Sequence, residues 1–135
     1  MPQKQMLLVV ACALIDVDSR VLVAQRPASK NMAGLWEFPG GKLEAEESPE
    51  TALIRELREE LGIAVKADCL APFVFASHAY PEFHLLMPLY VCRKWEGLPC
   101  PHHHQALKWV FPKDLNRYPM PAADLPLIPM LCDLL

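Results

Sequence analysis

The sequence predicts an α/β protein in which strands and helices are arranged in layers. Runs of alternating or continuously apolar residues, typical of β-strands, occur along most of the chain. Between them lie one strongly marked helical segment near the middle and a second, apolar helical segment at the C-terminal end. Strands that flank helices in mixed order indicate a layered α/β domain.

Length and composition fit one globular domain over residues 1–135. A chain with 53% hydrophobic and 21% charged residues can bury a core of its own. The formal net charge of -3 argues against a nucleic-acid polymer as partner, because a phosphate backbone selects a basic surface. It does not argue against a nucleotide, since a bound metal can meet the charge of the phosphates.

Cysteine usage and hydropathy favour a reducing cytoplasm. The five cysteines form no C-x-x-C pair, which is typical of buried free thiols. Lys4 followed by apolar residues resembles a lipoprotein signal, but the apolar run before Cys12 is too short. No stretch approaches the length of a membrane span, so we expect no membrane partner.

The first half of the chain is expected to begin with a β-hairpin. Residues 6–16 and 20–25 are strand-like, and a polar turn near Asp16 separates them. A loop at 27–34 leads to the segment 36–42. The second half supplies strands at 73–77, 83–92 and 106–111, a helical turn that begins at Pro112, and a C-terminal helix over 125–135.

The best-marked element is a helix over residues 49–61. Ser48 is a favourable N-cap, Pro49 fits the first helical position, and Gly62 fits the position just past the end. Its leucines gather on one arc of the helical wheel. We therefore expect this helix to pack on the sheet with that arc.

Three glutamates of this helix form an unfavourable group. Glu56, Glu59 and Glu60 share one arc, so like charges are neighbours at three and four residues. The helix dipole also disfavours negative charge in the last turn. A hard divalent cation would remove the repulsion, because Mg²⁺ takes carboxylate and phosphate oxygens. From the helix alone, the alternative is a solvated face on which Arg55 pairs with Glu59.

The segment that carries these glutamates resembles the Nudix box of nucleoside diphosphate-linked hydrolases. Every fixed position of that pattern is present over residues 41–63, in the spacing Gly41-x5-Glu47-x7-Arg55-Glu56-Leu57-x-Glu59-Glu60-x-Gly62-Ile63. The order of elements outside the box is similar to that of MutT-type members. The resemblance implies an αβα sandwich, with a mixed β-sheet between the box helix and the C-terminal helix.

The resemblance also implies roles for the box residues. The family's metal-ligand and base carboxylates match Glu56, Glu59 and Glu60, with Glu56 as the base that deprotonates water. Gly40 matches a residue whose backbone carbonyl binds metal. Arg55 would orient the glutamates, and Glu47 matches the first glutamate of the box, whose part is structural.

Residues outside the box helix resemble the family's substrate contacts. An arginine at a strand end would meet the phosphates, and a phenylalanine with the backbone around it would form a wall against the base. Including weaker matches, the implied substrate-binding residues are Arg26, Asn31, Glu37, Phe38, Pro39, Gly40, Lys42 and Asp124.

Two departures from MutT concern the base and the metal. Asp124 stands where MutT has Asn, and relatives assigned to cytidine nucleotides carry Asp in a similar setting. An ionised Asp accepts two donors from the guanine edge or one from cytosine, which favours a guanine-type base. The alternative is that Asp124 caps the following helix.

The second departure is His103, where MutT-type members place a metal-binding glutamate. Because imidazole suits Mn²⁺ better than Mg²⁺, His103 as a ligand would shift the metal preference toward Mn²⁺. The alternative is that the histidines are exposed and the box carboxylates suffice.

The resemblance implies a Mg²⁺-dependent (or Mn²⁺-dependent) pyrophosphohydrolase that converts 8-oxo-dGTP-type oxidised nucleotides to monophosphate and pyrophosphate. Such an enzyme cleans the nucleotide pool used in DNA replication and repair. The first alternative is hydrolysis of CTP or modified dCTP, which Asp124 favours. A non-catalytic nucleotide sensor is less favoured, because no box carboxylate is missing. The sequence predicts no oligomeric state.

Overall fold

The computed structural model describes residues 4–135, so the first three residues of the predicted domain lie outside the described part. Its main elements are β1 (Gln5–Leu14), β2 (Val21–Gln25), β3 (Trp36–Glu37), β4 (Gly40–Lys42), α1 (Pro49–Leu61), β5 (Ala71–Ala79), β6 (Phe83–Cys92), β7 (Ala106–Val110) and α2 (Leu127–Leu134). Short 3-10 helices occur at Ala67–Cys69 and Pro112–Arg117.

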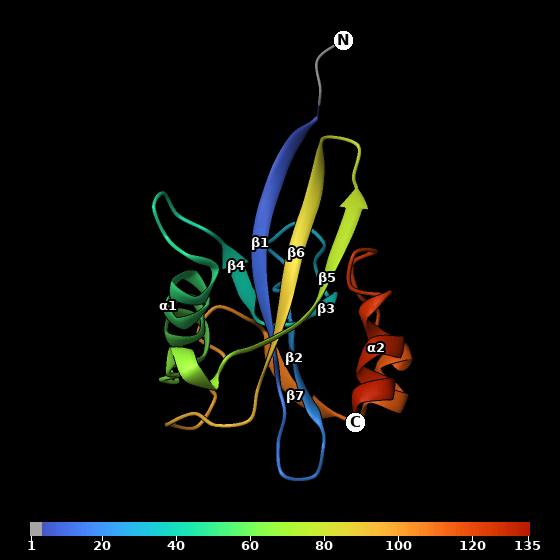
Figure 1. The fold of residues 1–135 in the computed structure, drawn as a ribbon. Coiled ribbons are helices and arrows are strands. Elements are labelled where there is room, and N and C mark those ends of the chain that lie inside the picture. Colours follow the sequence, from blue (N-terminus) through green and yellow to red (C-terminus); the bar gives the residue numbers. More distant parts are fainter. Residues whose placement is uncertain (1–3) are drawn as a thin grey trace.

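The strands form two sheets, and the larger one is mixed. Its order is β4-β1-β6-β5, with β1 parallel to β6 and the other neighbours antiparallel. The smaller sheet has the order β3-β2-β7 and is antiparallel. α1 and α2 lie on opposite sides of the strands (Figure 1). The predicted αβα sandwich with a mixed sheet is confirmed, and the second sheet is an addition to it.

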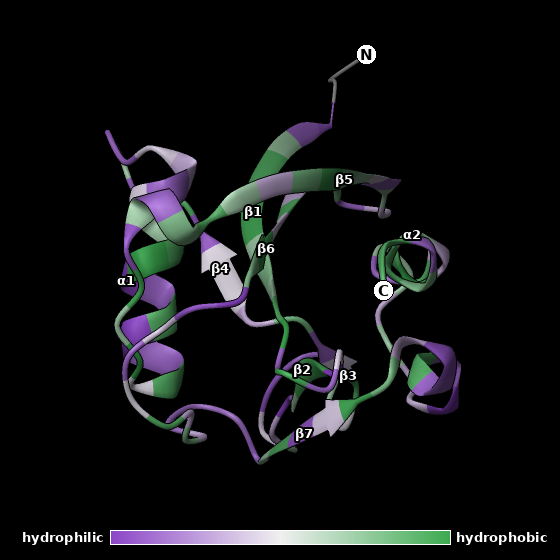
Figure 2. Cartoon of the chain, turned by 60° about the horizontal axis from the view of Figure 1, so that its bottom comes forward, coloured by the Kyte–Doolittle hydropathy of each residue, from purple (hydrophilic) through white to green (hydrophobic). Residues whose placement is uncertain are grey.

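β1 is shared by two hydrophobic clusters because its side chains alternate between the two faces of the sheet. Val10, Cys12 and Leu14 pack with the apolar arc of α1. Ala11 and Ala13 belong to the cluster that includes α2. Figure 2 shows the apolar character along β1 and β6, between the helices. The same alternation holds along β6, where Leu89 and Val91 belong to the α2 cluster and Tyr90 and Cys92 to the α1 cluster, so the helices pack on opposite faces of the same strands.

The predicted β-hairpin of residues 6–16 and 20–25 is wrong. β1 and β2 belong to different sheets, and an isolated bridge between Ile15 and Val21 joins their ends. Both edges of β1 are occupied by β4 and β6, so β2 pairs with β3 and β7 instead. Because β2 separates from β1, its end and the following Arg26 lie next to β3.

α1 has the predicted bounds, and both caps form. The hydroxyl of Ser48 accepts a hydrogen bond from the Thr51 amide at 3.1 Å. Gly62 has φ 72° and donates its N–H to the Arg58 carbonyl at 3.0 Å. This left-handed conformation favours glycine. The caps therefore fix the ends of the helix, and with them the position of its glutamates along β4.

The remaining elements differ little from the prediction. β6 is as expected, while β5 is longer than 73–77 because it pairs along β6. α2 begins at Leu127, after Pro126 at its N-cap position. Within residues 4–135, no helix has the length and apolar character needed to cross a membrane.

Candidate active site

The glutamates of α1 lie directly against the backbone of β4. The amide of Gly40 donates a hydrogen bond to Glu60 Oε2 at 3.3 Å. A Cβ at Gly41 would come within 2.4 Å of Glu56 Cδ, and one at Gly40 within 2.0 Å of the Val10 carbonyl oxygen. Two adjacent residues without side chains are thus required for the strand to fit between β1 and the carboxylates.

Arg55 donates hydrogen bonds to three carboxylates through one guanidinium group. Its Nε and Nη2 donate to the two oxygens of Glu47 at 2.8 and 2.9 Å. Its Nη1 donates to Glu56 Oε1 at 2.9 Å and to Glu59 Oε2 at 3.3 Å. The hydrogen bonds from Arg55 lower the pKa of Glu47 to about 2. Arg55 therefore orients Glu56, and the predicted Arg55–Glu59 pair is also present.

The carboxyl group of Glu60 is in a largely buried position beside Glu56. Burial, followed by the charges of Glu56 and Glu37, raises the pKa of Glu60 to about 9, although the Gly40 N–H opposes the shift. The carboxyl group therefore keeps a proton at neutral pH in the absence of other ligands. A cation beside it would favour release of that proton.

The donor atoms around Glu60 fit a hard divalent cation. The carboxylates of Glu56, Glu59 and Glu60 and the carbonyl of Gly40 supply oxygen only, which is what Mg²⁺ prefers. The raised pKa of Glu60 marks a place where positive charge is lacking. Among residues 4–135, no three His, Cys, Asp or Glu side chains are gathered in a preformed metal cluster. Arg55 holds Glu56 and Glu59, so this ligand set stays a prediction.

Two of the predicted substrate residues, Arg26 and Glu37, form a second group at the ends of β2 and β3. Arg26 Nη1 lies 3.1 Å from Glu37 Oε1, and Arg26 Nε donates to the Asn31 carbonyl at 2.7 Å. Asn31 thus reaches this group through its backbone, while its side chain is exposed. The side chain of Lys42 is exposed as well, and its carbonyl accepts a hydrogen bond from Arg55 Nη2 at 3.2 Å.

Asp124 is buried beside Phe38. Burial and the charge of Glu37 raise the pKa of Asp124 to about 7, and a backbone hydrogen bond from Phe38 opposes the shift. The Trp36 amide donates to the Pro119 carbonyl at 2.8 Å, which ties β3 to the loop that carries Asp124. No side chain caps α2, so the alternative of Asp124 as its cap is not borne out.

Sequence reasoning singled out His103 and missed His104. The side chain of His103 is exposed. That of His104 is 5% exposed, and its Nε2 lies 2.8 Å from Glu37 Oε2. A signal was present in the sequence, since His104 comes just before the strand at 106–111. The neighbouring Gln105 amide donates to the Gln25 carbonyl at 2.9 Å, which places His104 at the end of β2.

Glu37 connects the two groups into one site. Its charge raises the pKa of both Glu60, in the box helix, and Asp124, in the loop before α2. Phe38 and Pro39, both buried, follow Glu37 and lead to the glycines of β4. The segment from Glu37 to Gly41 thus spans the site from the substrate residues to the box carboxylates.

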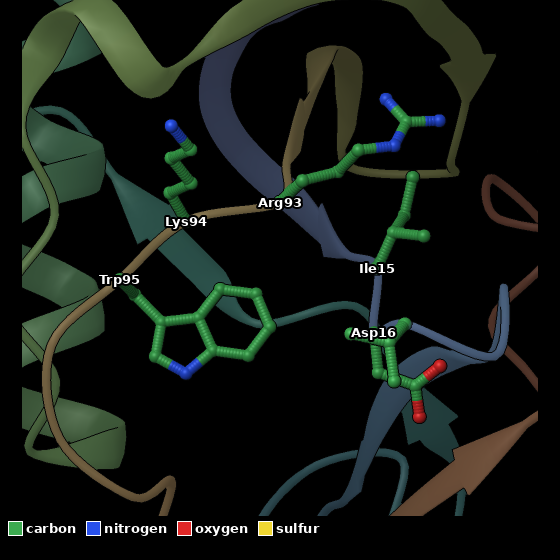
Figure 3. A pocket seen from close by; sticks show the side chains of 6 residues that line it. Ile15, Asp16, Arg93, Lys94 and Trp95 are labelled. Carbon is green, nitrogen blue, oxygen red and sulfur yellow. The ribbon is translucent and has the colours of Figure 1, made fainter.

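A cavity of about 650 Å³ lies apart from these residues. It is lined by Ile15, Asp16, Val17, Arg93, Lys94 and Trp95. In Figure 3 the indole of Trp95 faces Ile15 and Asp16 across it. Its volume suits a small molecule. None of the predicted site residues lines it, so cavity size does not identify the active site here.

Comparison with known proteins identifies the family of this chain. A family model described as NUDIX domain matches residues 10–130. The chain is 42% identical to the CTP pyrophosphohydrolase of Escherichia coli strain K12, over 88% of this chain and 87% of the relative. It is also 42% identical to the 8-oxo-dGTP diphosphatase of Proteus vulgaris, over 72% and 85%. A solved structure from a study of MutT from Aliivibrio salmonicida and Vibrio cholerae has a TM-score of 0.82 and 31% identity, covering 97% of this chain and all of that one.

The protein is a layered α/β domain in which a helix rich in carboxylates packs against a Gly-Gly strand. Together with the family match, this places it in the class of hydrolases that act on phosphoric anhydrides. The chain belongs to the Nudix family. Within that family it is of the MutT type. Nudix hydrolases generally need a divalent metal.

Proposed function

We propose that the protein hydrolyses a nucleoside triphosphate to a monophosphate and pyrophosphate, with an 8-oxo-dGTP-type nucleotide as preferred substrate. The observation that carries the proposal is the arrangement of the α1 carboxylates: Glu60 lies against the Gly40 backbone of β4, and Arg55 hydrogen-bonds Glu56 and Glu59. The name of the Proteus vulgaris relative supports the choice of base.

In the proposed reaction, Glu56 accepts the proton of the attacking water. The hydrogen bond from Arg55 at 2.9 Å fixes the plane of the Glu56 carboxylate, so that the base meets water in a set orientation. Arg26 and the wall formed by Phe38 hold the nucleotide at the other end of the site. The chemistry that a bound divalent cation supplies is neutralisation of the negative charge that develops on the phosphate chain.

We assign Glu56, Glu59, Glu60 and the Gly40 carbonyl as the residues that hold the metal, with Mg²⁺ as the metal and Mn²⁺ as a second choice. The oxygen-only donor set supports this assignment. We place the enzyme in the cytoplasm, which its five free cysteines support.

A panel of substrates tests the proposal. The value of kcat/KM is measured for 8-oxo-dGTP, dGTP, CTP, 5-methyl-dCTP and ADP-ribose, with Mg²⁺ and with Mn²⁺. We expect 8-oxo-dGTP to exceed dGTP and the cytidine nucleotides. Cytidine nucleotides winning by more than about tenfold would overturn the choice of base. Absence of turnover for every nucleotide would overturn the activity.

The second candidate is hydrolysis of CTP or modified dCTP, and the burial of Asp124 favours it. With a pKa of about 7, Asp124 carries a proton in part of the molecules at neutral pH. A protonated carboxyl donates one hydrogen bond and accepts another. That pattern matches the ring nitrogen and the amino group of cytosine. The Escherichia coli relative named CTP pyrophosphohydrolase supports this candidate.

A further inference from the structure

The Glu37 carboxylate is held from two sides by residues of different depth. His104, 5% exposed, contacts it from behind through Nε2 at 2.8 Å. Arg26, 28% exposed, contacts it from the solvent side at 3.1 Å. Glu37 itself is 22% exposed. The three side chains thus form a row from the interior to the surface.

The His104 ring has a polar atom that the fold does not use. Its Nδ1 is buried and has no hydrogen-bond partner within the described chain. Buried polar atoms are nearly always paired, so an orphan atom needs an explanation. An apolar side chain of similar size would avoid the cost of burying Nδ1. We therefore infer that this position holds a histidine because the ring makes its other polar contact, through Nε2, with Glu37.

The loop that carries His104 is attached to both halves of the site. The His102 amide donates to the Glu60 carbonyl at 3.0 Å, at the end of α1. Three residues further along, immediately after His104, the Gln105 amide donates to the Gln25 carbonyl of β2 at 2.9 Å. His104 is thus placed by backbone contacts on either side, and its ring can fix Glu37 relative to the box helix.

We propose that His104 is a positioning residue for substrate binding, which acts by holding Glu37 and, through Glu37, Arg26. This inference rests on the proposed function, because Glu37 and Arg26 are assigned to the substrate there. Without the His104 donor, Glu37 keeps Arg26 as its partner and faces the carboxyl groups of Glu60 and Asp124, whose pKa values its charge already raises. The Glu37–Arg26 pair then loses its fixed position.

Three substitutions at one position test which atom of the ring matters. His104→Gln places an amide N–H near the position of Nε2, whereas the shorter His104→Asn places it near that of Nδ1. His104→Leu removes both. We expect KM to rise about 10- to 100-fold for the Leu and Asn variants, as for loss of a hydrogen bond to a charged group. The Gln variant should stay within about threefold of the wild type, and kcat should change little, because Glu56 and Arg55 are untouched.

A double-mutant cycle separates positioning from general destabilisation. If His104 acts through Glu37, His104→Leu should have no further effect on KM in a Glu37→Ala background. His102→Leu, an exposed neighbour in the same loop, is the matched control and should behave as wild type. Thermal unfolding of each variant checks that it is folded. If the Leu variant does not fold, the Gln and Asn variants decide the matter.

Binding measured by calorimetry keeps this inference apart from the proposed function. The probes are the α,β-methylene analogues of dGTP and CTP, and the dissociation constant should follow the same order as KM. A Leu variant with wild-type affinity, or an unchanged effect in the Glu37→Ala background, would overturn the role of His104. A wild-type protein that hydrolyses none of the panel would overturn the proposed function, while its affinity for the analogues would still decide the role of His104.

Discussion

Replacing Glu60 by glutamine should stabilise the metal-free protein at neutral pH. Glu60 is buried next to Glu56 and within reach of the charge of Glu37, and its pKa in the folded state is about 9 against an ordinary value of 4.5. A group whose pKa is raised by folding contributes its full stability below the ordinary pKa. That stability is lost as the pH rises toward the folded-state pKa. Glutamine has a similar shape and does not titrate.

The size of the stability difference follows from the difference between the working pH and the ordinary pKa of the Glu60 carboxyl. At pH 7 the wild type has passed its ordinary value of 4.5 by about 2.5 units. Each pH unit is worth about 1.4 kcal/mol. Between acid and neutral pH, the free energy of unfolding of the variant should therefore increase by about 3 kcal/mol relative to that of the wild type. For a domain of this size that corresponds to a difference in Tm of roughly 10 °C.

The assay is denaturant or thermal unfolding of both proteins with a chelator present, from pH 5 to pH 8. The difference in the free energy of unfolding should grow steadily over this range in favour of the variant. Addition of Mg²⁺ should stabilise the wild type more than the variant, because Glu60 is an assigned ligand. A difference that stays flat with pH would refute the reasoning. Equal stabilisation of both proteins by Mg²⁺ would remove Glu60 from the ligand set.

Three further predictions concern turnover and specificity. Glu56→Gln should lower kcat by about 10²–10⁴-fold with an unchanged circular dichroism spectrum, since it removes the base; near-normal steady-state turnover would contradict that role. Gly41→Ala should lower kcat by at least about tenfold, because its Cβ would lie 2.4 Å from Glu56 Cδ and displace the base; kcat equal to wild type would show that the strand can yield. The ratio of kcat/KM for CTP to that for 8-oxo-dGTP should fall as the pH rises from about 6 to 8, because Asp124 loses the proton that cytosine requires. Asp124→Asn does not titrate and should give a flat ratio; a slope that persists in this variant would assign the pH dependence to another group.

Elements with local signals could be predicted from the sequence. The bounds of α1 follow from Ser48, Pro49 and Gly62, because capping depends on the residues of the helix ends. The same holds for the three glutamates, whose spacing on one helix fixes which face they share. The clamp of Arg55 on Glu56 was expected as well, and the structure places the two at 2.9 Å.

Features that depend on strand pairing could not be predicted in the same way. The separation of β1 from β2 results from competition between distant strands for the edges of β1, and the turn at Asp16 carries no sign of it. The contact of His104 with Glu37 joins residues 67 positions apart. Burial of Asp124 depends on how its loop docks on β3, so its raised pKa is a tertiary property.

The two halves of the site differ in how the chain supplies them. The carboxylates assigned to the metal come from consecutive turns of one helix, whereas Arg26, Glu37, His104 and Asp124 come from four separated stretches of the chain. If these residues contact the nucleotide as proposed, substitutions in those stretches would alter the accepted base one contact at a time while α1 is left intact. Divergence of substrate preference within such a domain therefore requires few changes. Two relatives that are each 42% identical to this chain are named for different activities, CTP pyrophosphohydrolase and 8-oxo-dGTP diphosphatase. Such a difference is expected if few changes are enough to alter substrate preference.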